Sequence, residues 1–282
     1  MIAYSIINLV LFSGGRIMST EQRGIGSVEV GGQLLRVLTE ADGPMMLRDL
    51  AASAGMTAAK AHPYMVSYMR LGLIEQDRAS GRYELGPLAL QMGLASMRRL
   101  NPVRVATEAI AELVLQINQT VALSVWGNHG PTVVRMEEGT GAVHVNMRVG
   151  SIMSLLGTAT GRVFAAFLPP KMIENFIESG LDRASVGDEA GRQMTRKQIN
   201  AHLAEVRENG LARAVERPIP GVNAFSAPVF DHAGSIALVI TAIGPSHTFD
   251  ADWNGPIAAD LRKCAASISA RLGYSAKGSK AA

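Results

Sequence analysis

The sequence has 282 residues, of which 48% are hydrophobic and 18% charged, a composition that forms a packed core and excludes an intrinsically disordered chain. This length allows two domains of about 100–200 residues each. The formal net charge of +3 is too small to identify a nucleic-acid-binding protein by itself, so any basic surface has to be local.

The chain contains one cysteine, Cys264, which excludes an internal disulfide and is typical of a protein of the reducing cytoplasm. We therefore expect a cytoplasmic location. Because Cys264 lies in an Ala- and Ser-rich helical stretch, we expect a small buried side chain, with a redox sensor or a nucleophile as the alternative.

The first residues are unusual because Ile2 to Phe12 form an apolar run with no Lys or Arg before it. The run is shorter than the about 20 residues that span a bilayer, and it lacks the positive start of a signal peptide. We expect residues 1–23 to be an extension that is disordered or not translated, with translation starting at Met18; mass spectrometry of the native N-terminus tests this. A membrane tether is the alternative, which cell fractionation would test.

Helical periodicity begins at Ser27, a predicted N-cap, and stops at the Asp42-Gly43-Pro44 turn. A short helix is predicted over 47–54, and a longer one, capped by Thr57, runs to Leu71. Two helices joined by a tight turn form a helix-turn-helix, whose second helix enters the major groove of DNA. Pro63 removes a backbone hydrogen bond, so we expect it to shorten or bend this second helix.

Two strand-like runs, 73–76 and 82–85, flank a turn at 78–81 and predict a hairpin after the helices. Three helices and a hairpin make a winged helix-turn-helix domain, which we place at residues 24–86. Basic side chains on the helix and the hairpin are placed to contact phosphates, and residues early in the helix to meet base edges. The predicted DNA-binding residues are Arg48, Thr57, Ala58, Lys60, His62, Tyr64, Arg70, Arg78 and Arg82.

A linker helix is predicted over residues 87–101, and Asn101-Pro102 starts the next helix, which opens a second domain over 102–273. Residues 274–282 are predicted to be a flexible tail. In the second domain we expect strands at 120–126, 132–136, 143–149, 212–216, 225–230 and 236–243, with helices at 159–168, 171–179 and 195–209 and a final one ending near 272. Hairpin strands mixed with helices predict an α+β fold.

Several segments occur in an order that points to a family: 26–29, Leu47-Arg48-Asp49-Leu50-Ala51, 71–77, 81–86, Gly150-Ser151, Gly157-Thr158-Ala159-Thr160-Gly161-Arg162, 206–212, Glu216 and 227–231. Together they cover roughly 24–273 and resemble the IclR-type transcriptional regulators. The resemblance implies a winged helix-turn-helix, a connecting helix and a GAF-like effector domain. It also implies homodimers or homotetramers bound to double-stranded operator DNA and controlled by a small-molecule effector, such as a small organic or aromatic acid.

The chain departs from this family at three positions. Pro63 stands where the family usually has Arg, which puts that DNA contact in doubt. Arg162 replaces the common Lys, and Ala214 replaces an acidic residue that often anchors the effector.

The effector pocket is predicted where Gly157 to Gly161 begin a helix, because small residues expose backbone N–H groups and a helix N-terminus favours an anion. The segment 221–226 is predicted to form the opposite wall. A compact turn that binds nothing is the alternative. The predicted effector-binding residues are Met147, Leu155, Gly157, Thr158, Ala159, Thr160, Glu216, Val222, Asn223, Ala224 and Ser226.

Catalytic chemistry is not indicated by the sequence. The six histidines show no metal-ligand spacing, and neither a G-x-S-x-G elbow nor a phosphate-binding loop occurs. We therefore predict no catalytic residue, metal or cofactor, and no membrane partner. A metabolite-transforming enzyme with an accessory helix-turn-helix domain is the alternative, and turnover of a bound ligand would support it.

Overall fold

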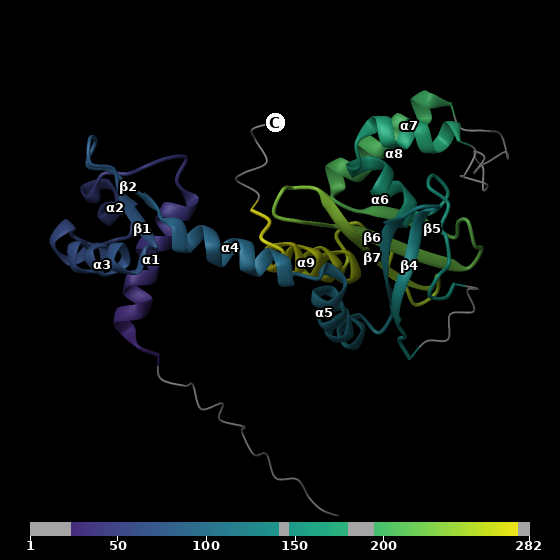
Figure 1. The fold of residues 1–282 in the computed structure, drawn as a ribbon. Coiled ribbons are helices and arrows are strands. Elements are labelled where there is room, and N and C mark those ends of the chain that lie inside the picture. The colour runs from purple at the N-terminus through teal and green to yellow at the C-terminus, as the bar shows by residue number, and fades with distance from the viewer. Residues whose placement is uncertain (1–23, 141–146, 180–194, 276–282) are drawn as a thin grey trace, which may run out of the picture. The chain divides into compact units, whose positions relative to one another are not determined.

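The computed structural model describes residues 24–140, 147–179 and 195–275, which form two compact units, one ending at Arg99 and the other beginning at Leu100 (Figure 1). The predicted extension 1–23 and residues 276–282 of the predicted tail lie outside the described residues. None of the helices in the described ranges is long and apolar enough to cross a membrane.

The first unit contains three helices, a two-stranded hairpin and a fourth helix. In chain order these are α1 Gly26–Glu40, α2 Leu47–Ser53, α3 Ala58–Leu71, β1 Ile74–Gln76, β2 Tyr83–Leu85 and α4 Pro87–Arg99. Leu34, Leu50, Met65 and Ile74 are almost completely buried between them. The predicted winged helix-turn-helix is therefore confirmed.

The ends of α3 follow from its sequence. The Oγ1 of Thr57 accepts a hydrogen bond from the amide of Lys60 at 3.3 Å, and Gly72 ends the helix with φ of 74°, a left-handed conformation that favours glycine. The helix continues past Pro63 to Leu71, the predicted end, so of the two predicted effects of the proline, shortening is excluded. The predicted cap at Ser27 was wrong, because α1 begins one residue earlier and Ser27 lies inside its first turn.

The second unit is built on an antiparallel sheet of five strands in the order β4-β3-β7-β6-β5. The strands are β3 Thr120–Gly127, β4 Gly130–Glu137, β5 Ala212–Val215, β6 Val222–Phe230 and β7 Ile236–Pro245. Every strand pair within this sheet is antiparallel, which confirms the α+β class.

Helices cover both faces of this sheet (Figure 1). They are α5 Pro102–Ile117, α6 Ala159–Phe167, α7 Pro170–Glu178, α8 Arg196–Asn209 and α9 Pro256–Arg271. One hydrophobic core joins α5 and α9 to the first face, and a second core lies between the other face and α6 to α8. The side chains that β6 and β7 direct to this second face form the floor under α6.

Two predicted segments of the second domain differ from the structure. The strand predicted at 143–149 falls partly outside the described residues, and Met147 to Val149 are not in a strand. The segment 221–226, predicted as the opposite wall of the pocket, belongs mostly to β6, which begins at Val222, three residues before the predicted start of the strand. Alternate residues of this segment therefore point to opposite faces of the sheet.

Candidate DNA-binding and effector-binding sites

The first candidate site is the exposed side of α3. Lys60, His62 and Arg70 are exposed there, as their predicted role requires. Tyr64 lies on the other side, where its ring is packed closely against Gly31 of α1. Ala58 is also partly buried against the core, so neither Tyr64 nor Ala58 belongs to the exposed face.

The hairpin between β1 and β2 carries the next basic residues. The carboxylate of Asp77 accepts hydrogen bonds from the amides of Ser80 at 2.6 Å and Ala79 at 2.9 Å, and these bonds lower the pKa of Asp77. They order the turn that carries Arg78, which is exposed. The guanidinium of Arg82 donates to the carbonyl of Pro44 at 3.2 Å, which ties the hairpin to the turn before α2.

The charge of this surface suits an anionic partner. Helix α3 contains no Asp or Glu that would repel an anion. Thr57 caps its N-terminal end, and Arg70 lies in its last turn. Arg48 of α2 is also exposed, although its Nε lies 3.4 Å from a carboxylate oxygen of Asp49, which offsets part of its charge. This arrangement can hold phosphates with Lys and Arg while the face of α3 meets the bases.

The second candidate site lies where α6 begins above β6 and β7. Three hydroxyl groups meet there and are buried: the Oγ1 of Thr241 lies 2.8 Å from the Oγ1 of Thr160 and 2.8 Å from the Oγ of Ser226. The strand register explains this meeting, because Ser226 pairs with Thr241 across β6 and β7. A third contact, of 3.5 Å between Thr160 and Ser226, closes a ring in which each of the three hydroxyls can donate to another, so the capacity that remains is for accepting hydrogen bonds.

The start of α6 is held close to the preceding segment. Thr158 caps the helix by accepting from the amide of Gly161 at 3.0 Å. A Cβ on Gly161 would lie 2.1 Å from the carbonyl oxygen of Ser154, so only glycine allows this approach. On the next residue, the buried guanidinium of Arg162 donates to the carbonyl of Arg213 at 2.6 Å, and its burial lowers its pKa. These contacts fix the first turn of α6, whose N–H groups are suited to an anion.

A pocket with a cavity volume of about 60 Å³ opens at this place. Of the residues predicted to bind an effector, six line it: Met147, Thr158, Ala159, Thr160, Val222 and Ala224. The sequence did not predict the other lining residues, which are Met153, Ala214, Arg217, Pro218, Ile219, Thr241 and Ile243. Among the described residues of this lining Arg217 alone is charged, and the others are largely apolar.

The remaining predicted effector residues do not line the pocket. Leu155 is completely buried in the core, and Gly157 lies in the turn before α6. Asn223 points away because it alternates with Val222 and Ala224 along β6, and its Oδ1 accepts from the amide of Glu216 at 3.0 Å. Glu216 itself is exposed. Ser226 contributes indirectly, through its contact with Thr241.

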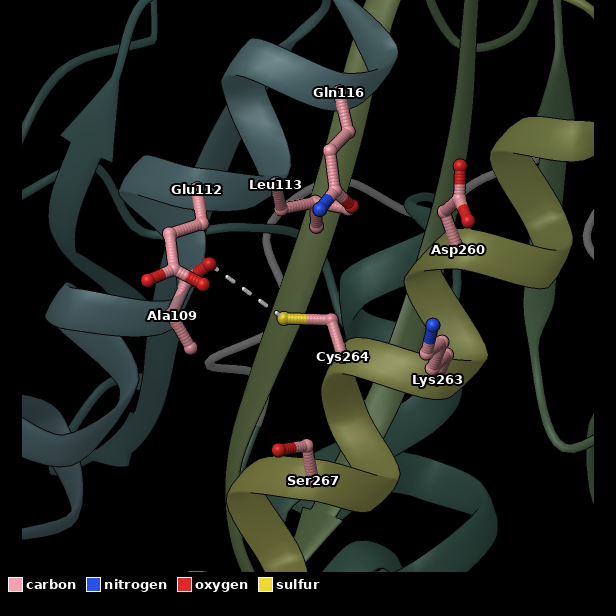
Figure 2. Close-up of a pocket in the computed structure, with 8 residues that line it drawn as sticks. All are labelled: Ala109, Glu112, Leu113, Gln116, Asp260, Lys263, Cys264 and Ser267. Atoms are coloured by element: carbon pink, nitrogen blue, oxygen red, sulfur yellow. Dashed lines mark hydrogen bonds between the residues drawn. The ribbon is translucent and has the colours of Figure 1, made fainter. Parts of the chain in front are cut away.

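A second, larger hollow of about 140 Å³ lies between α5 and α9. Figure 2 shows Glu112 and Gln116 on α5 facing Asp260, Lys263 and Cys264 on α9. The Sγ of Cys264 lies 3.9 Å from the carbonyl of Ala109, and burial raises the pKa of this thiol to about 11. The hollow is shallow, and its lining carries both acidic and basic side chains. It therefore favours neither an anionic nor a cationic ligand. The pocket at α6 is therefore the better candidate despite its smaller size.

Metal chemistry finds no support in the parts of the chain that the structure describes, since no three His, Cys, Asp or Glu side chains gather there as a metal site requires.

Comparison with known proteins assigns the two units to one family. The model of the IclR helix-turn-helix domain matches residues 27–78, and the model of the bacterial transcriptional regulator IclR C-terminal domain matches residues 94–270. The chain belongs to the IclR family. The resemblance stated from the sequence motifs is thereby confirmed.

Individual IclR-family relatives are similar over nearly their whole length. The crystal structure of HmgR from Pseudomonas aeruginosa is 38% identical, with a TM-score of 0.80 over 89% of this chain and 100% of HmgR. The glycerol operon regulatory protein of Streptomyces griseus is 29% identical over 257 residues, which cover 89% of this chain and 98% of that protein. KipR of Bacillus subtilis, a helix-turn-helix transcriptional regulator, is 26% identical over 231 residues, which cover 82% of this chain and 90% of KipR.

The family also decides the class of protein. As an IclR-family member, the chain is a DNA-binding transcriptional regulator and not an enzyme, as the sequence predicted. Its first unit contains the family's helix-turn-helix domain, and its C-terminal unit is the family's effector domain.

Proposed function

We propose that operator binding by this IclR-family regulator is modulated by a small organic or aromatic acid that binds in the pocket below the start of α6. DNA binding is assigned to residues 24–86 and effector binding to residues 102–273. The observation that carries the proposal is Arg217, a cation beside an otherwise apolar pocket.

The electrostatics of the pocket favour a carboxylate. Arg217 forms no ion pair within the described residues, and a guanidinium binds a carboxylate with two parallel hydrogen bonds. The first-turn amides of α6, at Ala159 and Thr160, add the partial positive charge of a helix N-terminus. None of the described residues that line the pocket is acidic, and Ala214 stands where the family resemblance implies an acidic residue.

The size and lining of the pocket limit the rest of the ligand. A single water needs about 10–15 Å³ of such volume, so a cavity of about 60 Å³ takes a small molecule or one end of a larger one. Met147, Val222 and Ile243 provide apolar contacts. The hydroxyl oxygens of Thr160 and Thr241 can accept a hydrogen bond from a donor group of the ligand at the floor.

The regulator is proposed to act as a homodimer or a dimer of dimers that contacts DNA through two copies of α3. Helix α4 has no buried residue, and Leu90, Leu94 and Met97 recur on one side of it with 66%, 45% and 47% of their surface exposed. We assign this stripe to α4 of a second copy, because a helix-turn-helix dimer binds two half-sites related by a two-fold axis.

The test of the effector proposal is binding of small carboxylic acids, aliphatic and aromatic, compared with their neutral amides. Calorimetry with the full chain should show binding of at least one acid and none of its amide. Arg217→Gln should weaken that acid at least ten-fold, whereas Arg196→Gln, which breaks an exposed ion pair with Glu174, should leave it unchanged.

Two results would contradict the effector proposal. Equal binding of acid and amide would exclude a carboxylate anchor, and equal binding by Arg217→Gln would exclude this arginine as the anchor. Chemical conversion of the bound acid, followed by NMR, would support the enzyme alternative instead.

A further inference from the structure

The outward face of α3 is unusual for a helix that enters the major groove. Ala61 and Met65 are completely buried and define the inner side of the helix. At about 100° per residue, the opposite side is the row Ala59, Pro63, Val66 and Arg70. Ala59, Pro63 and Arg70 are exposed and Val66 is half-buried.

The first three residues of this row have no hydrogen-bonding group in their side chains. The polar residue nearest to the row, Ser67, has no donor to offer, since its Oγ donates to the carbonyl of Pro63 at 3.0 Å. Lys60 and His62 lie on the two flanks of the row, and Arg70 lies at its C-terminal end. The centre of the row therefore meets a partner through apolar contact.

In the major groove thymine presents an apolar group, its C5-methyl, whereas guanine and adenine are most commonly read by bidentate side chains, Arg or Lys for guanine and Asn or Gln for adenine. We infer that the operator is read through thymine methyl groups that contact Ala59 and Pro63, with Pro63 as a specificity-determining residue. The inference rests on the proposed entry of α3 into the groove.

The charges of α3 favour DNA over a protein as the partner of this row. A purely apolar row would equally suit a protein surface, but α3 contains no acidic residue, Lys60 lies on one flank of the row and Arg70 lies at its C-terminal end. These cations match the phosphates on either side of the groove. The hairpin of the same unit carries the exposed Arg78 at its turn, although Glu75, Asp77 and Glu84 leave the hairpin as a whole without net positive charge.

The experiment begins with selection of the full chain on random DNA duplexes at fixed salt. Each thymine of the selected half-site is then replaced by uracil, which removes only the methyl group. Burying one methyl group is worth about a four-fold change in affinity, so uracil at the contacted thymines should weaken binding by about three- to five-fold.

The variant Pro63→Ser tests the residue itself. Serine replaces the apolar ring by a short polar group and is a far better helix former than proline, so the variant should keep α3 folded. It should lose the uracil penalty at one thymine of each half-site and keep the penalties at the others. Arg70→Ala is the control: it should weaken all sequences alike and leave every uracil penalty unchanged.

The outcomes separate this inference from the proposed function. Sequence-specific binding without a uracil penalty, or with the same penalties in Pro63→Ser, would overturn the reading by Pro63 and leave the regulator intact. Failure to select any sequence would overturn the proposed function and the inference with it.

Discussion

Replacing Gly161 by alanine is predicted to destabilise the second unit, although alanine is normally the better residue inside a helix. The propensity term alone favours alanine by about 1 kcal/mol. The added Cβ, however, would lie 2.1 Å from the carbonyl oxygen of Ser154 and 2.3 Å from that of Leu155. Both atoms belong to the backbone, so the start of α6 has to move.

The clash outweighs the gain in helix propensity. Overpacking costs about 1–3 kcal/mol and more where no flexible side chain can yield, so we expect a net loss of about 2 kcal/mol. With a urea dependence of about 2 kcal/mol per molar for a unit of this size, the unfolding midpoint should fall by about 1 M. The same movement should disturb the pocket, because Thr160 lies next to Gly161.

Tryptophan fluorescence gives the assay, since the two tryptophans of the chain, Trp126 and Trp253, both lie in the second unit. The matched control is Gly32→Ala in α1, where a Cβ would meet nothing within 4 Å. That variant should leave the fluorescence midpoint unchanged and stabilise the first unit. An unchanged or higher midpoint for Gly161→Ala would refute the reasoning.

Three further predictions concern other parts of the molecule. Because the pKa of Cys264 is raised to about 11, only about one thiol in a thousand is ionised at pH 8. Iodoacetamide should therefore modify the folded chain about a hundred-fold more slowly than the unfolded chain. A modification rate that levels off below pH 9 would contradict this. Arg78→Ala should reduce the slope of log affinity for DNA against log salt by about 1, measured by fluorescence anisotropy, whereas an unchanged slope would remove Arg78 from the phosphate contacts. Leu90→Glu in α4 should shift the chain to monomer in sedimentation and weaken operator binding, and an unchanged mass would place the dimer contact elsewhere.

The fold could be predicted closely wherever local signals decide the structure. Thr57, Gly72 and Asn101 mark helix ends through side-chain caps or a left-handed backbone, and these signals act over a few residues. The start of α1 was missed because Ile25 precedes it without any side-chain cap. The effect of Pro63 could not be decided from the sequence, because α3 keeps its full length only if its packing against the core outweighs the loss of one backbone hydrogen bond.

The effector pocket could be predicted only in part because it combines distant segments. The start of α6 carries its own signal of small residues, and Thr158 and Thr160 were therefore found. Thr241 could have been found by period-two alternation along the predicted strand 236–243, but which face of the sheet lies under α6 depends on the whole topology. Arg217 gave no signal, since it follows the end of β5 in a segment without periodicity.

The most direct test of the central claim is an anisotropy titration of the full chain against DNA from upstream of its own gene and its neighbours, with and without the acid that binds it. An effector-responsive IclR-family regulator predicts saturable, competitor-resistant binding whose affinity changes when the acid is added, and no such change in Arg217→Gln. Specific binding that no acid alters would contradict the modulation by an acid effector, and the absence of specific binding to any of these DNAs would contradict the account as a whole.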